Sequence, residues 1–259
     1  MKQFISDLKK YWYFAIYSAK TDLKAEVANS YLNWIWWVLE PFLNMIVYTF
    51  VFKNLFPSDK SFPVFIYSGL MFWNFFNRTI GYSVKLVRAN KEIVTKVYVP
   101  KFILLIGNMF LNAFKMLVGL VILIPLIIIY KVQITWTALM IIPLFLILFV
   151  FSFGCGTILL HFGVFVDDLS YAVGILLNML MFLSGVFYDL QTGLPEGYGT
   201  FIGTFNPVAC IIDGLHQVLL NGVLPNMPVL GIWTVISIIM SVIGIRIIYK
   251  YENSYVKVI

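Results

Sequence analysis

Six long apolar runs, separated by charged or turn-forming segments, constrain the fold of this 259-residue chain more than any other feature. A helix needs about 20 mostly apolar residues to cross the hydrocarbon core of a bilayer. The chain is 61% hydrophobic and 12% charged, whereas a typical soluble domain is roughly 25% charged. The sequence therefore predicts an all-α integral membrane protein with six transmembrane helices, over residues 31–52, 62–84, 102–130, 136–166, 170–188 and 229–249.

The basic residues divide unequally between the two sides of the membrane that six spans define. Thirteen of the eighteen lysines and arginines fall in segments on the side of the termini, and three fall on the other side: Lys53, Lys60 and Lys131. Cytoplasmic segments carry the excess of positive charge, so both termini are predicted to be cytoplasmic. This distribution also accounts for the net charge of +6, so the sequence predicts no nucleic-acid partner.

Residues 1–28 form a segment of their own ahead of the first span. Phe4, Leu8, Trp12, Ile16 and Leu23 recur at helical spacing, with the lysines largely on the remaining face. This pattern predicts an amphipathic helix that contacts membrane lipids at the cytoplasmic interface, followed by a six-span domain over residues 29–259. The alternative is a helix that packs on the protein itself.

Residues 194–225, between the fifth and sixth runs, are too apolar for a loop in water and too short for a regular span. Asn206 followed by Pro207 is typical of a helix start, and Gly222 is typical of a helix end. Irregular backbone at membrane depth is tolerated only against protein or a wet cavity. We therefore expect a re-entrant helical hairpin of two outer half-helices that shape an exit.

Polar and aromatic residues recur every three or four positions in the first, second and fifth predicted spans. Polar groups are costly in a bilayer and usually face a bundle interior or a wet path. These stripes predict a shared substrate pathway, or alternatively hydrogen bonding between helices with no pathway. The predicted pathway residues are Trp37, Asn44, Tyr48, Asn74, Arg78, Asn178 and Tyr188.

Charged groups within the predicted spans need partners. Glu40 and Arg78 fall at similar depth, counted from the cytoplasmic ends of their spans, and are predicted to pair. Lys115 lies nearer the middle of the third span, on a stripe with Asn108 and Asn112. The sequence does not identify the partner of Lys115, and Asp213 is only a guess.

Small residues mark the fourth and sixth spans. Residues of this kind at helical spacing let two helix backbones approach closely. We interpret both spans as structural, from the spacing of Ser152, Gly156 and Gly163 and of Thr234, Ser237 and Ser241.

The sequence contains none of the motifs that carry hydrolytic chemistry. It lacks a phosphate-cradling G-x-x-x-x-G-K-[ST] loop, a nucleophile elbow and a cluster of closely spaced metal ligands. Cys155 and Cys210 stand in apolar surroundings, as expected of small buried hydrophobic residues. The chain is predicted not to be an enzyme and to bind no cofactor of its own, so active transport would draw its energy from elsewhere.

The stretch KEIVTKVYVPK, residues 91–101, is short, charged and amphipathic, and it joins the second and third spans. In an ATP-driven exporter, a motor subunit must push on a short cytoplasmic helix that joins two spans. Ile93, Val97 and Val94 are predicted to insert into a groove of such a subunit. The charged residues at the rim of this contact would be Lys91, Glu92, Lys96 and Lys101. The alternative is an ordinary basic loop held on anionic lipid. The residues predicted to couple transport to an ATPase are Lys91, Glu92, Ile93, Val94, Lys96 and Val97.

The order of these segments resembles the ABC-2 type permeases of cell-surface polysaccharide exporters, which export O-antigen, capsular polysaccharide or wall teichoic acid. The resemblance covers essentially the whole chain and is most specific at GLMFWNFF, KVYVPK and FNP. The other matching segments, such as SYLNWIWWVLEPFLNMIVYTFVF and VFVDDLSYAVGILLNMLMFLSGVFY, are less specific.

The resemblance implies a permease homodimer that works with two ATP-binding-cassette subunits, which bind ATP and Mg²⁺. It implies export of a polyisoprenyl-diphosphate-linked glycan across a bacterial inner membrane, with a coupling helix at about residues 91–99. It also implies that the first and fifth spans form a lateral gate for the lipid anchor. The alternatives are an ABC-2 exporter of a small hydrophobic drug or lipid, and a membrane-embedded enzyme or scaffold without transport.

Overall fold

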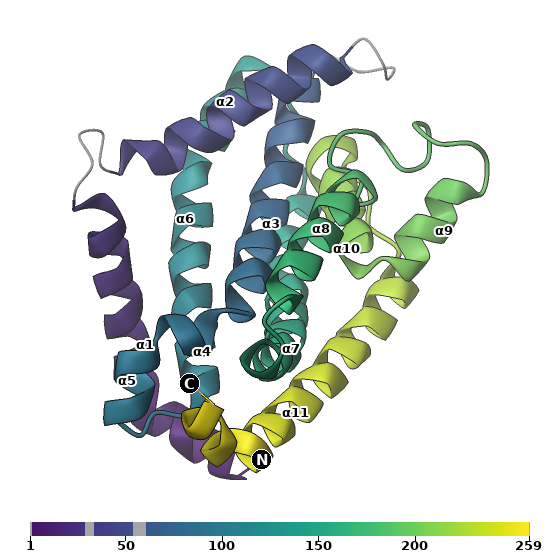
Figure 1. The fold of residues 1–259 in the computed structure, drawn as a ribbon. Coiled ribbons are helices and arrows are strands. Elements are labelled where there is room, and N and C mark those ends of the chain that lie inside the picture. The colour runs from purple at the N-terminus through teal and green to yellow at the C-terminus, as the bar shows by residue number, and fades with distance from the viewer. Residues whose placement is uncertain (1, 29–33, 54–60, 259) are drawn as a thin grey trace.

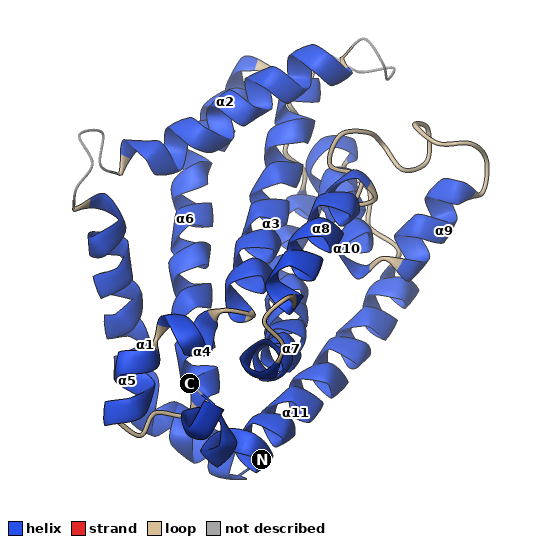
Figure 2. Cartoon of the chain, viewed as in Figure 1, coloured by secondary structure: helices blue, strands red, loops and turns tan. Residues whose placement is uncertain are grey.

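The computed structural model describes residues 2–28, 34–53 and 61–258, and within these ranges the regular structure is entirely helical (Figures 1 and 2). The start of the first predicted span, including residues 31–33, lies outside the described residues. The helices are α1 (Lys2–Val27), α2 (Ile35–Phe52), α3 (Phe62–Ser83), α4 (Leu86–Ala89), α5 (Lys91–Lys96), α6 (Lys101–Ile129), α7 (Ile141–Phe165), α8 (Leu169–Phe182), α9 (Tyr198–Phe205), α10 (Pro207–His216) and α11 (Met227–Val258), with a 3₁₀ turn η1 (Trp136–Met140) before α7 and a π turn η2 (Gln217–Asn221) after α10.

Four of the described helical segments are long and apolar enough to cross a membrane: Ile35–Phe52, Lys101–Ile129, Trp136–Phe165 and Met227–Tyr255. Two further predicted spans correspond to α3 and α8. α3 has 22 residues, but Asn74, Asn77 and Arg78 reduce its mean hydropathy. α8 has 14 residues, which at about 1.5 Å per residue is shorter than the roughly 30 Å hydrocarbon core.

The predicted helix over residues 170–188 is wrong beyond Phe182, where α8 ends. Gly185 adopts a left-handed conformation with φ of 66°, which favours glycine because it has no Cβ. The chain then folds back, and the Tyr188 hydroxyl donates a hydrogen bond to the Phe182 carbonyl at 2.6 Å. The Phe182 carbonyl, which would accept from a backbone amide in a continued helix, accepts from this hydroxyl instead.

The two termini lie at the same end of the molecule, together with α4 and α5, whereas α2 crosses α6 and α3 obliquely at the opposite end (Figure 1). We refer to these as the terminal end and the α2 end. α9 and α10 follow α8 toward the α2 end (Figure 1). Because α5 forms part of the charged segment of residues 91–101, this segment lies at the terminal end.

α3 is the central helix of the bundle, in contact with α2, α6, α7, α8 and α10. Its side chains are buried nearly all round, and Tyr67, Trp73 and Phe75 are among the largest fully buried side chains of the chain. A helix that neighbouring protein surrounds does not face lipid. α3 therefore tolerates polar residues that a lipid-facing helix would not.

α7 and α11 pack closely against each other through small residues. The sequence predicts close helix packing for both of these spans but not which helices they contact. A Cβ added to Gly154 would lie 2.9 Å from the Met240 Cβ, and one added to Gly244 would lie 1.9 Å from the Thr157 Oγ1. The Ser241 hydroxyl also donates to the Val150 carbonyl across the interface, at 3.2 Å. Only small side chains permit this backbone separation.

α1 packs along α6 with its alanines. Ala15 and Ala19 are buried, and a Cβ added to Gly107 would lie 3.2 Å from the Ala15 carbonyl oxygen. Trp12 makes an edge-to-face contact with Phe110, with ring centroids 5.2 Å apart. α1 thus packs on the protein itself, as the alternative interpretation of residues 1–28 expects. The position of α1 relative to a membrane interface stays a prediction.

The helical segment that α10 and η2 form together begins and ends where the sequence predicts. The Asn206 side chain accepts hydrogen bonds from the backbone amides of Val208 and Ala209, at 3.0 and 3.2 Å. Gly222 ends the segment in a left-handed conformation with φ of 66°. His216 in α10 is buried, with its Nε2 3.1 Å from the Phe65 carbonyl oxygen, which fixes α10 to the start of α3.

A buried ion pair joins the start of α6 to the last part of α11 at the terminal end. The Lys101 Nζ lies 3.3 Å from the Glu252 Oε1, and the side chains are 2% and 8% exposed. The Tyr98 hydroxyl donates to the other oxygen of the same carboxylate at 3.2 Å. The prediction that Lys101 lies at the rim of a partner contact is therefore wrong.

We expect Glu252→Gln to lower the free energy of unfolding by about 3–5 kcal/mol, because it leaves the Lys101 ammonium buried without its counter-charge. The double variant Lys101→Met, Glu252→Leu should recover most of this loss. Thermal unfolding of the detergent-solubilised chain measures both effects, with Glu92→Gln on the exposed face of α5 as the control. A double variant no more stable than Glu252→Gln would contradict the assignment.

Candidate functional site

Polar side chains from α1, α3, α6 and α8 line a cavity of about 750 Å³, which we call the lower cavity. It lies on the terminal-end side of a smaller upper cavity that has room for about 30 Å³ of water. The lower cavity is lined by Asp22, Ala25, Glu26, Asn77, Arg78, Gly81, Tyr82, Lys85, Asn108, Leu111, Asn112, Lys115, Ser170, Gly174, Leu177 and Asn178. Amide, hydroxyl and charged groups thus predominate on its wall.

The upper cavity lies between α2, α3 and α6 and has a more apolar lining. Its wall is formed by Trp37, Pro41, Tyr67, Met71, Asn74, Phe75, Arg78, Asn112, Lys115, Met116 and Gly119. Three of these residues, Arg78, Asn112 and Lys115, line the lower cavity as well. These three polar residues, which we call the polar partition, belong to the wall that the two cavities share.

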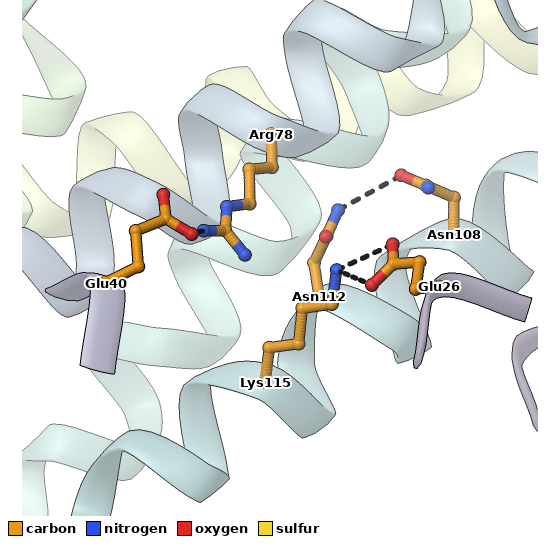
Figure 3. Close-up of polar contacts among 6 residues, drawn as sticks. All are labelled: Glu26, Glu40, Arg78, Asn108, Asn112 and Lys115. Atoms are coloured by element: carbon orange, nitrogen blue, oxygen red, sulfur yellow. Dashed lines mark hydrogen bonds and ion pairs between the residues drawn. The ribbon is translucent and has the colours of Figure 1, made fainter. Parts of the chain in front are cut away.

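The predicted pairing of Glu40 with Arg78 is confirmed (Figure 3). The Arg78 Nη2 donates to the Glu40 Oε2 at 3.0 Å, which joins α3 to α2. Depth in the predicted spans was sufficient to find this pair, because both residues lie on long helices that cross each other.

Lys115 pairs with Glu26 of α1, at 2.7 Å from its Oε1 and 2.5 Å from its Oε2 (Figure 3). The suggested partner Asp213 is wrong, since its carboxylate accepts a hydrogen bond from Gln217 within α10 at 2.6 Å. Glu26 is not predicted as the partner, because the sequence pattern of residues 1–28 is that of a helix at the membrane interface. Only the packing of α1 along α6 brings this carboxylate to Lys115.

Asn112 is held in the partition by two hydrogen bonds. Its Nδ2 donates to the Thr79 Oγ1 at 3.1 Å and to the Asn108 Oδ1 at 3.0 Å. Figure 3 shows Asn108 and Asn112 beside the ion pair of Glu26 and Lys115. The stripe of Asn108, Asn112 and Lys115 was visible in the sequence, but it was not assigned to the pathway.

The structure brings some of the predicted pathway residues together. Trp37, Asn74 and Arg78 line the upper cavity, and Arg78 and Asn178 line the lower one.

The other predicted pathway residues, Asn44, Tyr48 and Tyr188, line neither of these two cavities. Tyr48 contacts Phe187 with ring centroids 4.8 Å apart, and Tyr188 is buried. Their assignment to a pathway stays a prediction.

The segment predicted to couple to an ATPase forms a shorter helix than expected. α5 ends at Lys96, and Val97 is extended with φ of −131° and ψ of 134°, so the predicted helical extent of about 91–99 is wrong in its last turn. Val94 is buried in the core of the chain, where it anchors α5 and cannot enter a partner's groove.

The remaining residues of the coupling segment keep a surface for a partner. Lys91, Glu92, Lys96 and Val97 are exposed, and Ile93 is half-buried. α4, just before α5, is fixed to the end of α7, because Arg88 contacts the Asp167 carboxylate and donates to the Val164 carbonyl at 2.8 Å.

Among the residues that the structure describes, no group of three or more His, Cys, Asp or Glu side chains gathers as a metal site. The expectation that ATP and Mg²⁺ bind to a partner subunit stays a prediction.

Comparison with known proteins identifies relatives over nearly the full length. A family model described as "ABC-2 type transporter" matches residues 17–220. An O-antigen export system permease protein of Klebsiella pneumoniae is 24% identical over 240 residues, 92% of each chain. A protein of the same name from Myxococcus xanthus is 24% identical over 93% of each chain. A polysialic acid transport protein of Escherichia coli is 22% identical over 90% of this chain and 91% of that protein.

We expect a cysteine at Asn178 to react with a membrane-impermeant maleimide, because Asn178 lines the lower cavity. A cysteine at Ile175, on the same helix and 63% exposed but not in this lining, should stay unlabelled, because a thiol in lipid does not ionise. The measurement uses inside-out membrane vesicles and a background in which Cys155 and Cys210 are alanine. Equal labelling at the two positions would contradict an aqueous cavity beside Asn178.

Proposed function

The chain belongs to the ABC-2 type transporter family, and we propose that it is the transmembrane subunit of an ATP-binding-cassette exporter of polysaccharide. Its substrate would be a polyisoprenyl-diphosphate-linked glycan of the O-antigen, capsule or teichoic acid type, moved from the cytoplasm across a bacterial inner membrane. The observation that carries the proposal is the similarity over nine tenths of the chain to O-antigen and polysialic acid export permeases.

The cavity lining favours this substrate over a small hydrophobic drug or lipid. Asn77, Asn108, Asn112 and Asn178 present amides to the lower cavity, and each amide both donates and accepts hydrogen bonds. Sugar hydroxyls can hydrogen-bond to such groups, whereas an apolar molecule offers them no hydrogen-bond partner.

The proposed topology has six transmembrane helices, with α3 and α8 as the two beyond the four apolar candidates. The central position of α3 supports this, because its polar residues face protein and the cavities. The common end of both termini in Figure 1, together with the excess of lysine and arginine on that side, supports cytoplasmic termini. α9 and α10 would form the re-entrant hairpin at the outer end.

The exporter would be a homodimer of this chain bound to two ATPase subunits that hydrolyse ATP. Residues 91–99 would be the contact with each ATPase, supported by the exposed Lys91, Glu92, Lys96 and Val97. Tyr98 and Lys101, which follow Val97 in the chain, bind Glu252 of α11. A push on α5 would therefore reach α6 and α11 together.

Cells that lack this chain should accumulate lipid-linked glycan on the cytoplasmic side of the inner membrane. Reintroducing the chain together with its ATPase should release the glycan to the surface. Extraction of lipid-linked saccharides from spheroplasts, with and without surface digestion, measures both pools. Normal surface glycan with no intracellular build-up would overturn the proposal.

We expect Val97→Asp to abolish transport-coupled ATP hydrolysis. Val97 is exposed and would enter an apolar groove of the partner, where the carboxylate of an aspartate would be costly to bury. Membrane insertion should be unaffected, since Val97 is not part of the core. Val97→Ile is the matched control and should retain coupling. ATPase activity of the reconstituted complex tests this, and normal cycling of the Asp variant would show that Val97 is not at the contact.

A further inference from the structure

Two cations, Arg78 of α3 and Lys115 of α6, line both the upper and the lower cavity. Each holds a carboxylate from a different helix, Glu40 of α2 and Glu26 of α1 (Figure 3). The wall that the two cavities share therefore carries two cations, each paired with one anion.

We propose that Arg78 and Lys115 form an oxyanion site for the phosphate groups of the substrate's lipid-diphosphate headgroup, and that Glu26 and Glu40 occupy this site when no substrate is bound. The inference rests on the proposed function, because that function supplies a substrate with a diphosphate. It goes further by assigning the group that two particular side chains recognise.

The exposure of the four side chains supports exchange of the anions. Lys115 is 11% exposed and Arg78 31%, whereas Glu26 is 42% and Glu40 57% exposed. The cations are held in the wall, whereas each carboxylate is the more exposed member of its pair and comes from a neighbouring helix. An anion of higher charge can therefore compete with these carboxylates for the same cations.

A diphosphate is that stronger anion. It presents more negative charge than a single carboxylate, and its oxygens match the planar fork of an arginine guanidinium in a bidentate contact. Lysine binds phosphate as a compact point charge. Lys115 also lies 5.9 Å from the Trp37 ring, so the site has an aromatic wall beside the cation.

The lower cavity has two further charged residues in its lining, Lys85 and Asp22. Lys85 follows the end of α3 at Ser83 and adds another cation to this lining. Asp22 is an acid, and burial, with a contribution from Glu26, raises the pKa of its carboxyl above the usual value.

The test is direct binding to the purified chain in nanodiscs of phosphatidylcholine, which carry no net charge. Isothermal titration calorimetry would compare farnesyl diphosphate with farnesol and with inorganic diphosphate. We expect Lys115→Met and Arg78→Met each to weaken farnesyl diphosphate binding about tenfold or more, as loss of a charge-assisted hydrogen bond does. Lys115→Arg should retain binding, and Lys250→Met, exposed and outside both cavities, should match the wild type.

Glu26→Gln provides a test that misfolding cannot imitate. It removes the anion that competes for Lys115, so it should tighten farnesyl diphosphate binding severalfold. Unchanged affinity in both methionine variants, or weaker binding in Glu26→Gln, would overturn the inference.

The arms of the experiment also identify the source of the anion. Binding of farnesyl diphosphate with at least tenfold weaker binding of inorganic diphosphate would assign the site to a lipid headgroup. Equal binding of the two would overturn the headgroup assignment in favour of free phosphate compounds. Because the assay needs neither ATPase nor export, site-dependent binding in a chain whose loss leaves surface glycan normal would refute the proposed function and not the oxyanion site.

Discussion

A helix that carries charge can lie at the depth of a bilayer only where protein takes the place of lipid around it. α3 meets this condition, because α2, α6, α7, α8 and α10 surround it and its large side chains Tyr67, Trp73 and Phe75 are buried among them. Once α3 is shielded, Asn74 and Arg78 are placed against the cavities instead of lipid. Residues of α3 line both cavities, together with residues of the neighbouring helices.

The same constraint explains why the counter-charges come from other helices. Arg78 and Lys115 need anions nearby, and Glu40 and Glu26 supply them from α2 and α1. These two helices are therefore joined to α3 and α6 by ion pairs at the wall that the two cavities share.

At the terminal end, a second set of polar contacts ties the coupling segment to the rest of the bundle. Lys101 and Tyr98 share the carboxylate of Glu252, and the Tyr249 hydroxyl donates to Asp7 of α1 at 2.6 Å. α1, α6 and α11 are thereby joined directly beside α5. A short helix that is fixed on one face by Val94 and exposed on the other suits a segment that transmits force instead of absorbing it.

The helical class, most helix positions, the cap at Asn206 and the stop at Gly222 could be predicted from the amino-acid sequence. These depend on periodicity, composition and local hydrogen bonding, which are properties of neighbouring residues. The Glu40–Arg78 pair could be predicted as well, because depth along two long helices is fixed by residue count. The packing of α7 on α11, the binding of Lys115 to Glu26 and of Lys101 to Glu252, and the end of α8 at Phe182 became evident only in the folded chain. Each of these depends on how helices cross and rotate against one another, which results from many weak contacts between distant segments, and no local pattern in the chain records that sum.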